Sequence, residues 1–226
     1  MHPVALWLLE VMTLVASPDR AANQKAFPGY EETVAERRGR YAEIAEAARD
    51  VAYDPEEKPA FGGKYGRART AALMMAVAYH ESGFMKDVDV GPCWRGRANT
   101  STRCDSGRAA CLMQIHVSDG QTAEGYTREE LFADRKKCFR AGLHLLRRSM
   151  AACSHLPEKH KLASYASGTC KGGLKDSESL MALYEKFATL RPIPKAEASK
   201  SDAPKKAAPE DDASGAKDKA PRRDAK

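Results

Sequence analysis

The chain has 226 residues and 42% hydrophobic residues, enough for one sizeable domain with a packed core and some appendages. Its 37 Lys and Arg against 31 Asp and Glu give a net charge of +6, which is spread along the chain. A mildly basic protein suits an anionic polymer, either cell wall or nucleic acid. The sequence shows no aromatic-and-basic nucleic-acid motif, so nucleic acid is not expected as a partner.

The first 16 residues are apolar and similar to the core of a signal peptide. However, neither Lys nor Arg stands before the apolar run, which begins at Pro3, and Glu10 interrupts it. The segment is too short and too broken to span a membrane, so no stable membrane span is expected. A helix that docks on the rest of the protein is the alternative interpretation, and the sequence leaves both open.

Further along the chain, apolar residues at helical spacing predict a helix over 31–51, a loop over 54–63, and a helix from 67–70 to residue 82. Residues 86–107 are polar and predict a long loop, and a short apolar run follows over 110–116. Thr127 begins a capping box and Asp134 can cap the next helix. Helices near residue 165 and over 176–190 complete a mainly α protein. Its expected parts are an N-terminal helical extension (1–60), a main domain (61–190) and a disordered tail rich in Ala, Lys, Asp and Pro (191–226).

All six cysteines lie between residues 93 and 170, and none forms a Cys-x-x-Cys pair. A zinc site is therefore not expected, and neither a metal nor another cofactor is implied. The even number favours three disulfides and an extracytoplasmic setting, although six buried free thiols in the cytosol remain the alternative. The pairing hypothesis is Cys93–Cys104, Cys111–Cys138 and Cys153–Cys170, and the first of these would pin the long loop.

Glu81 is the candidate catalytic residue. In a helix it shares one face with Met74, Val77 and Ala78, at the point where Ser82-Gly83 ends the helix. A carboxylate at the end of an apolar stripe is expected at the wall of a cleft, where desolvation would raise its pKa and keep it protonated as a general acid. A surface charge just past the last buried turn is the alternative.

Four motifs follow one another in the chain: Glu81-Ser82-Gly83-Phe84, Cys111-Leu112-Met113-Gln114-Ile115, Gly142-Leu143-His144-Leu145-Leu146 and Ser164-Tyr165-Ala166-Ser167-Gly168. Over residues 66–190 this order resembles the soluble lytic transglycosylase (SLT) family of the lysozyme-like superfamily. The resemblance implies a lysozyme-like fold for residues 61–190. It also implies cleavage of the β-1,4 bond between N-acetylmuramic acid and N-acetylglucosamine in peptidoglycan.

By the same resemblance, Glu81 would be the catalytic acid and base. Gln114 would line the cleft and bond the sugar or Glu81, and Tyr165 would position Glu81. Met113 and Ser82 are expected to contact the glycan strand. The partner is thus peptidoglycan, bound by a monomer in the periplasm, outside the cell or on a phage particle.

The sequence departs from the family pattern in three places. Cys111 stands where the family has Gly, Ala166 stands where it has Asn, and the loop between Glu81 and Gln114 is longer. Three carboxylates in that loop could serve as a second catalytic carboxylate, namely Asp87, Asp89 and Asp105, but solvated positions are expected for them. We therefore expect a mechanism with a single carboxylate that yields 1,6-anhydro products.

Other readings of the same residues stay open. A hydrolytic muramidase would use a second carboxylate and water. A non-catalytic peptidoglycan-binding module would keep the cleft without the reaction. A cysteine nucleophile at Cys111 with His116 as base would need a free thiol. His80 lies about 100° round the helix from Glu81, and a position at the rim is expected for it.

Overall fold

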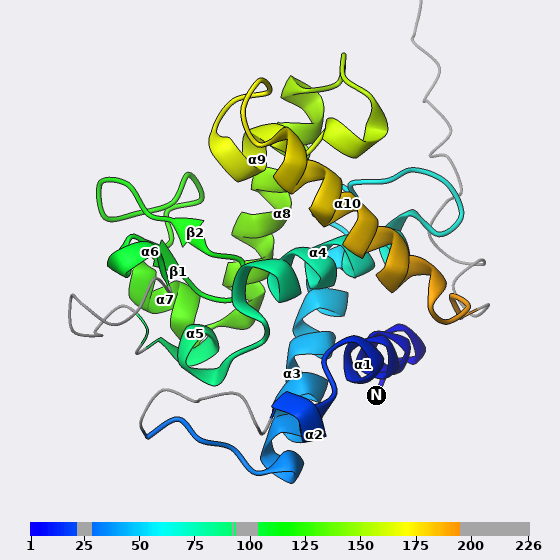
Figure 1. Ribbon diagram of the computed structural model, residues 1–226, viewed down its shortest axis with the longest axis vertical. Helices are drawn as coiled ribbons and strands as arrows, with labels where there is room; N and C mark the ends of the chain where they lie inside the picture. Colours follow the sequence, from blue (N-terminus) through cyan, green and yellow to red (C-terminus); the bar gives the residue numbers. More distant parts are fainter. Residues whose placement is uncertain (22–28, 92, 94–103, 195–226) are drawn as a thin grey trace, which may run out of the picture.

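A computed structural model describes residues 1–21, 29–91, 93 and 104–194 of the chain. They form a mainly helical protein in which α4 runs through the middle (Figure 1). The elements in order are α1 (Pro3–Val15), α2 (Pro18–Ala21), α3 (Val34–Tyr53), α4 (Gly66–Ser82), α5 (Lys86–Val90), α6 (Cys104–Gly107), β1 (Ala109–Ala110), β2 (Ile115–His116), α7 (Arg128–Ala133), α8 (Arg135–Ala152), the 3-10 turn η2 (Glu158–His160), α9 (Ala163–Ser167) and α10 (Leu174–Thr189).

The helix starts follow local chemistry that the sequence shows. Thr33 begins α3 with a capping box, in which its hydroxyl accepts from the backbone of Glu36 and the Glu36 carboxylate accepts from the backbone of Thr33. Thr127 and Glu130 repeat this arrangement at α7, as predicted. The predicted cap of α8 is also confirmed, because the Asp134 carboxylate accepts from two backbone N–H groups of the first turn.

One hydrophobic core joins α1, α3, α4, α7, α8 and α10, while Val88 of α5 packs in a second, smaller cluster with Cys93 and Cys104. The first helix packs on α3, α4 and α10, so the docked-helix interpretation of residues 1–16 is the one that the structure adopts. Trp7 is buried and its indole N–H donates to the carbonyl of Arg191 at 3.1 Å. The predicted extension over 1–60 therefore shares its core with the main domain. From residue 195 onward, the predicted disordered tail lies outside the described residues.

The three predicted disulfides are confirmed: Cys93–Cys104, Cys111–Cys138 and Cys153–Cys170 join Cα atoms 5.9, 6.2 and 5.5 Å apart. The described cysteines include no free thiol. The second disulfide fixes the turn before β2 to the first half of α8, and the third ties the end of α8 to the segment after α9. Each of the last two therefore holds a loop against the same long helix.

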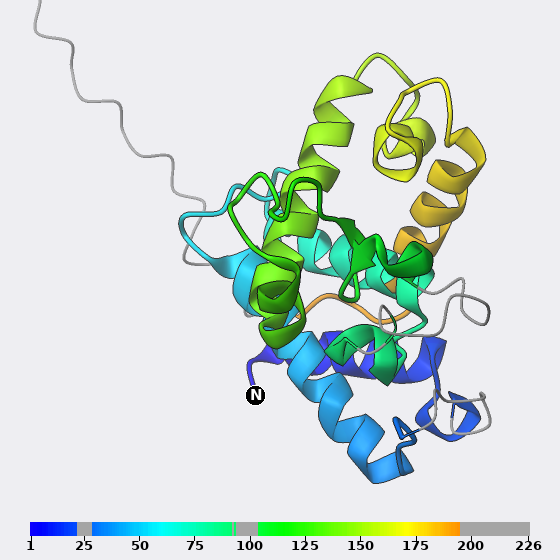
Figure 2. The same ribbon diagram turned by 90° about the vertical axis from the view of Figure 1, so that its left-hand side faces the viewer.

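The polar stretch 86–107 differs from the loop that was predicted. It contains two short helices, α5 and α6, at its ends, while residues 94–103 lie outside the described part of the chain. A two-residue antiparallel pair, β1 with β2, follows and was not predicted either. Both errors have the same cause, because elements of two to five residues are too short to display a hydrophobic period. Figures 1 and 2 show these small elements grouped beside one end of α4.

Candidate functional site

Glu81 lies in the last turn of α4, and its side chain is 26% exposed. The predicted apolar face is confirmed, since Met74, Val77 and Ala78 are fully buried. Burial extends further round the helix than the sequence indicated, because α3, α10, α1 and α8 all pack against α4. Glu81 is thus a half-buried carboxylate at the point where a central helix emerges from the core.

The turn that follows Glu81 is held from several sides. Gly83 ends α4 in the left-handed conformation with φ of 58°, which glycine adopts without strain. Phe84 also has a positive φ of 53°, an uncommon value for a residue with a side chain. Its ring is fully buried against Tyr41 and Tyr79, with ring centroids 5.5 and 5.4 Å away. This packing fixes the direction in which the chain leaves the Glu81 helix.

Ser82 belongs to the same turn and was predicted to contact the glycan. It is only 8% exposed, and its hydroxyl donates to the carbonyl of Ala78 and accepts from the N–H of Phe84 at 3.1 Å. The hydroxyl is therefore used both as a donor and as an acceptor at the end of the helix. Ser82 therefore supports the turn after Glu81, and its contact with the glycan stays a prediction.

His80 lies beside Glu81, with its Nδ1 3.5 Å from Glu81 Oε1. The expected rim position agrees with an exposed fraction of 36% for its side chain, but the contact with Glu81 was not expected. The hydrogen bond to Glu81 raises the pKa of His80, and the negative charges of Glu81 and Asp176 act in the same direction. A protonated His80 would place a positive charge directly next to the candidate catalytic carboxylate.

Tyr165 on α9 is the residue that the structure brings toward Glu81 from a distant part of the chain. Its phenol donates to the carbonyl of Met113 at 2.8 Å. Burial and the nearby Glu81 carboxylate raise the pKa of Tyr165 well above its usual value. The phenol therefore stays protonated and serves as a permanent donor, which links the Met113 segment to the vicinity of Glu81.

The Met113 side chain does not reach the surface. It is 0% exposed and packs on α8 where that helix carries Gly142, since a Cβ built at Gly142 would lie 2.5 Å from the Met113 methyl group. The Met113 side chain is thus part of the core in this structure, and its contact with a glycan stays a prediction. The second and third motifs are instead in contact, because Met113 of the second packs closely on Gly142 of the third.

Gln114 lies in the tight turn between β1 and β2. Its side-chain amide donates to the carbonyl of Cys111 at 3.0 Å, so part of its hydrogen bonding closes the turn. Cys111 and Gln114 both have positive φ, 57° and 48°. Positive φ is uncommon for a residue with a side chain, and Cys111 is also joined by a disulfide to Cys138 on α8. This disulfide also leaves Cys111 without the free thiol that a cysteine nucleophile requires.

The three loop carboxylates were expected to be solvated, and for two of them this is wrong. Asp87 and Asp89 are 1% and 2% exposed. Asp89 is held by Arg135, with N···O distances of 2.8 Å to both carboxylate oxygens, and by Arg40 at 3.2 Å. Asp105 remains partly exposed and pairs with Arg108 at 2.8 Å.

The arginine network around Asp89 was missed by the sequence analysis. Arg40 on α3 bonds the buried Glu32 carboxylate and donates to the carbonyl of Phe84 at 2.8 Å, directly after the Glu81 turn. Arg40 and Asp89 are 49 positions apart, and Arg135 is 46 beyond Asp89. At such separations no local pattern marks the three residues as partners.

The fold and the site define a mainly α, disulfide-linked protein with a half-buried carboxylate at the end of its central helix. Comparison with known protein families, with curated proteins and with solved structures found no match. Within the described ranges, no helix is long and apolar enough to cross a membrane. The same ranges hold no group of three His, Cys, Asp or Glu side chains arranged to bind a metal ion.

Proposed function

We propose that the protein is a peptidoglycan lytic transglycosylase with a lysozyme-like domain and that Glu81 is its catalytic acid and base. The observation that carries this proposal is the half-buried Glu81 carboxylate at the end of α4, whose negative charge contributes to the raised pKa of Tyr165 on α9. Two residues of the four motifs that resemble the SLT family are thus near enough to interact electrostatically. The three disulfides suit an extracytoplasmic site of action, in the periplasm, outside the cell or on a phage particle.

The reaction needs one carboxylate. Protonated Glu81 gives its proton to the oxygen of the glycosidic bond as the bond to the anomeric carbon breaks. The Glu81 carboxylate then takes the proton of the muramic acid C6 hydroxyl, whose oxygen attacks the anomeric carbon. The product is a 1,6-anhydro sugar, no water is consumed, and Glu81 is protonated again.

The surroundings of Glu81 favour this route over hydrolysis. A hydrolase usually adds a second carboxylate as nucleophile or as base for water. Of the three loop candidates, Asp87 and Asp89 are buried and Asp105 pairs with Arg108. The remaining loop residues, 94–103, include no Asp or Glu.

The test is a zymogram on purified peptidoglycan with the wild type, Glu81→Gln and the control Glu46→Gln, which changes a half-buried Glu on α3. We expect clearing by the wild type and the control but none by Glu81→Gln, while pull-down by insoluble peptidoglycan persists in all three. Mass spectrometry of the products should show anhydro ends. Reducing ends alone would assign a muramidase, and binding without clearing by the wild type would assign a glycan-binding module.

A further inference from the structure

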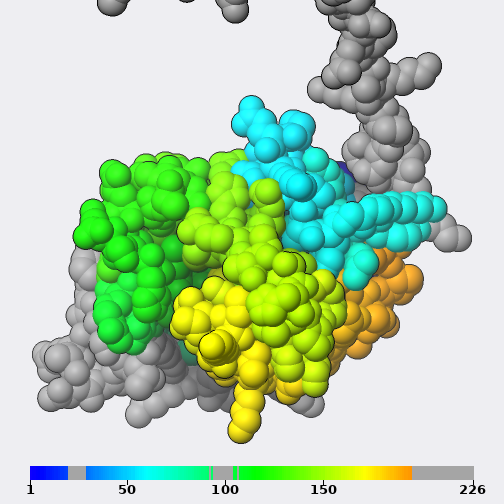
Figure 3. All heavy atoms as spheres, turned by 90° about the horizontal axis from the view of Figure 1, so that it is seen from above, coloured from blue at the N-terminus to red at the C-terminus, as the bar shows by residue number. Residues whose placement is uncertain are grey.

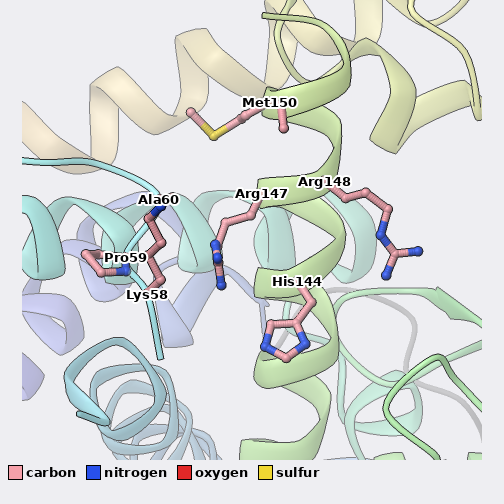
Figure 4. A pocket seen from close by; sticks show the side chains of 8 residues that line it. Lys58, Pro59, Ala60, His144, Arg147, Arg148 and Met150 are labelled. Carbon is pink, nitrogen blue, oxygen red and sulfur yellow. The ribbon is translucent and has the colours of Figure 1, made fainter. Parts of the chain in front are cut away.

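A hollow of about 570 Å³ lies between α8 and the loop that precedes α4. Figure 3 shows the loop, in cyan, and the end of α8, in yellow-green, next to each other on one face of the molecule. Cationic and small apolar residues line it: Lys58, Pro59, Ala60, His144, Arg147, Arg148, Met150 and Ala151. The loop contributes the first three and α8 contributes the others (Figure 4).

The hollow is separate from the candidate catalytic site. Gly142 marks the side of α8 that packs on Met113, and Met113 in turn bonds Tyr165. At about 100° per residue, Arg147 lies about 140° and Ala151 about 180° round the helix from Gly142. The hollow therefore faces away from the Glu81 side of the protein.

On this side of α8, the positive charges of its first half have acidic partners, whereas those near its end have none among the described residues. Lys136 pairs with Asp50 at 2.6 Å, and Arg140 bonds Asp54 and Glu57 at 2.7 and 2.8 Å. By contrast, no described residue offers an acidic partner to Lys58, Arg147 or Arg148.

The acidic groups near the hollow are already engaged. His144 contacts Glu57 through one ring nitrogen and Glu124 through the other, both at 2.9 Å. Glu57 also bonds Arg140. These two carboxylates are therefore not available to Arg147, which is half-buried and faces Lys58 from the opposite wall in Figure 4. Arg148 is exposed and points to the other side of α8 in that view.

We propose that this hollow binds the carboxylates of the acidic stem peptides of peptidoglycan, at a second site remote from Glu81. A guanidinium and an ammonium on opposite walls can hold one carboxylate between them with charge-assisted hydrogen bonds. The small apolar surfaces of Pro59, Ala60 and Ala151 suit the alanine side chains of such a peptide better than a bare phosphate. This inference rests on the proposed function, since that function supplies the peptide-bearing polymer.

The probe is a fluorescent stem peptide, L-Ala-γ-D-Glu-meso-diaminopimelate-D-Ala, whose binding to the full chain is followed by anisotropy. Lys58→Gln with Arg147→Gln should weaken binding by about 10- to 100-fold, because two charged partners of the ligand are lost. The matched control, Lys186→Gln with Arg191→Gln, removes two exposed charges on and just after α10 and should change binding by less than about twofold. Circular dichroism checks that both double variants fold.

Two further arms separate the sources of an anion. In the first arm, the peptide with amidated carboxylates should bind weakly to the wild type, with the affinity that the free peptide has for Lys58→Gln/Arg147→Gln. In the second arm, inorganic phosphate should not displace the free peptide from the wild type. Equal binding of the free and amidated peptides, equal loss in both double variants, displacement by phosphate, or no binding by the wild type would each overturn the proposal. Glu81→Gln should bind the peptide normally, so a failure of the catalytic proposal is distinguishable from a failure of this one.

Discussion

Asp89→Asn tests whether the buried ion network supports both the fold and the Glu81 turn. The Asp89 side chain is 1% exposed and accepts from two arginines whose side chains are 7% and 23% exposed. The amide would leave Arg40 and Arg135 close together without this counter-charge. Removal of one partner from a buried ion pair typically costs about 3–5 kcal/mol.

The measurement is urea unfolding followed by circular dichroism, with the disulfides intact. With a denaturant slope of about 2–3 kcal/mol per M, a loss of about 3–5 kcal/mol lowers the midpoint by roughly 1–2.5 M. The control is Glu43→Gln, which removes another acidic partner of Arg135, but one whose side chain is 66% exposed. Its expected effect is about 0–1 kcal/mol because solvent screens the pair.

The same variant should also affect the candidate site. Arg40 donates to the carbonyl of Phe84, three residues after Glu81, so its displacement would change the direction of the turn. We expect weaker zymogram clearing by Asp89→Asn, measured without urea at a temperature at which the variant is folded. Similar midpoints for Asp89→Asn and Glu43→Gln would refute the reasoning on stability, and full clearing by a folded Asp89→Asn would refute the link to Glu81.

Three other variants or titrations follow from the contacts described above. Tyr165→Phe removes the donor to the Met113 carbonyl and should destabilise the protein by about 1–3 kcal/mol in urea unfolding; an unchanged midpoint would contradict a structural role for the phenol. Gly142→Ala places a methyl group against Met113 and should lower the melting temperature, whereas the larger space left by Met113→Ala in the same chain should restore part of that loss. NMR titration of His80 should give a pKa above 6.5 in the wild type and a lower pKa in Glu81→Gln. Because folding raises this pKa, the contribution of His80 to stability is present below pH 6.5 and is lost as the pH rises through the raised pKa. A His80 pKa that is equal in both proteins would show that the contact with Glu81 is not made in solution.

Local chemistry in the sequence was sufficient to predict much of the helical structure. Thr127 and Asp134 start helices through bonds made within three residues, as predicted, and Gly83 ends α4 through its own backbone freedom. The cysteine pairing was also predictable, since each proposed bridge joined a loop to a nearby segment.

The site was predicted less well, because its geometry depends on contacts between distant residues. The burial of Asp89 follows from Arg40 and Arg135, which lie on helices far away in the chain. Met113 was expected to contact the glycan strand, because a motif shows which residues lie near a site but not which way each side chain points. Only its packing on Gly142 settles the direction.

The hydrogen bond between Trp7 and the Arg191 carbonyl spans 184 positions, and this has a consequence for synthesis. The ribosome makes α1 well before Arg191, which supplies one of the partners of α1. At about 5–20 residues per second, roughly 10–40 s separate the two events. Until then an apolar helix that includes Trp7, Leu8 and Met12 cannot bury its full contact surface. The nascent chain therefore presents a hydrophobic segment that chaperones or export factors have time to bind before the protein closes over it.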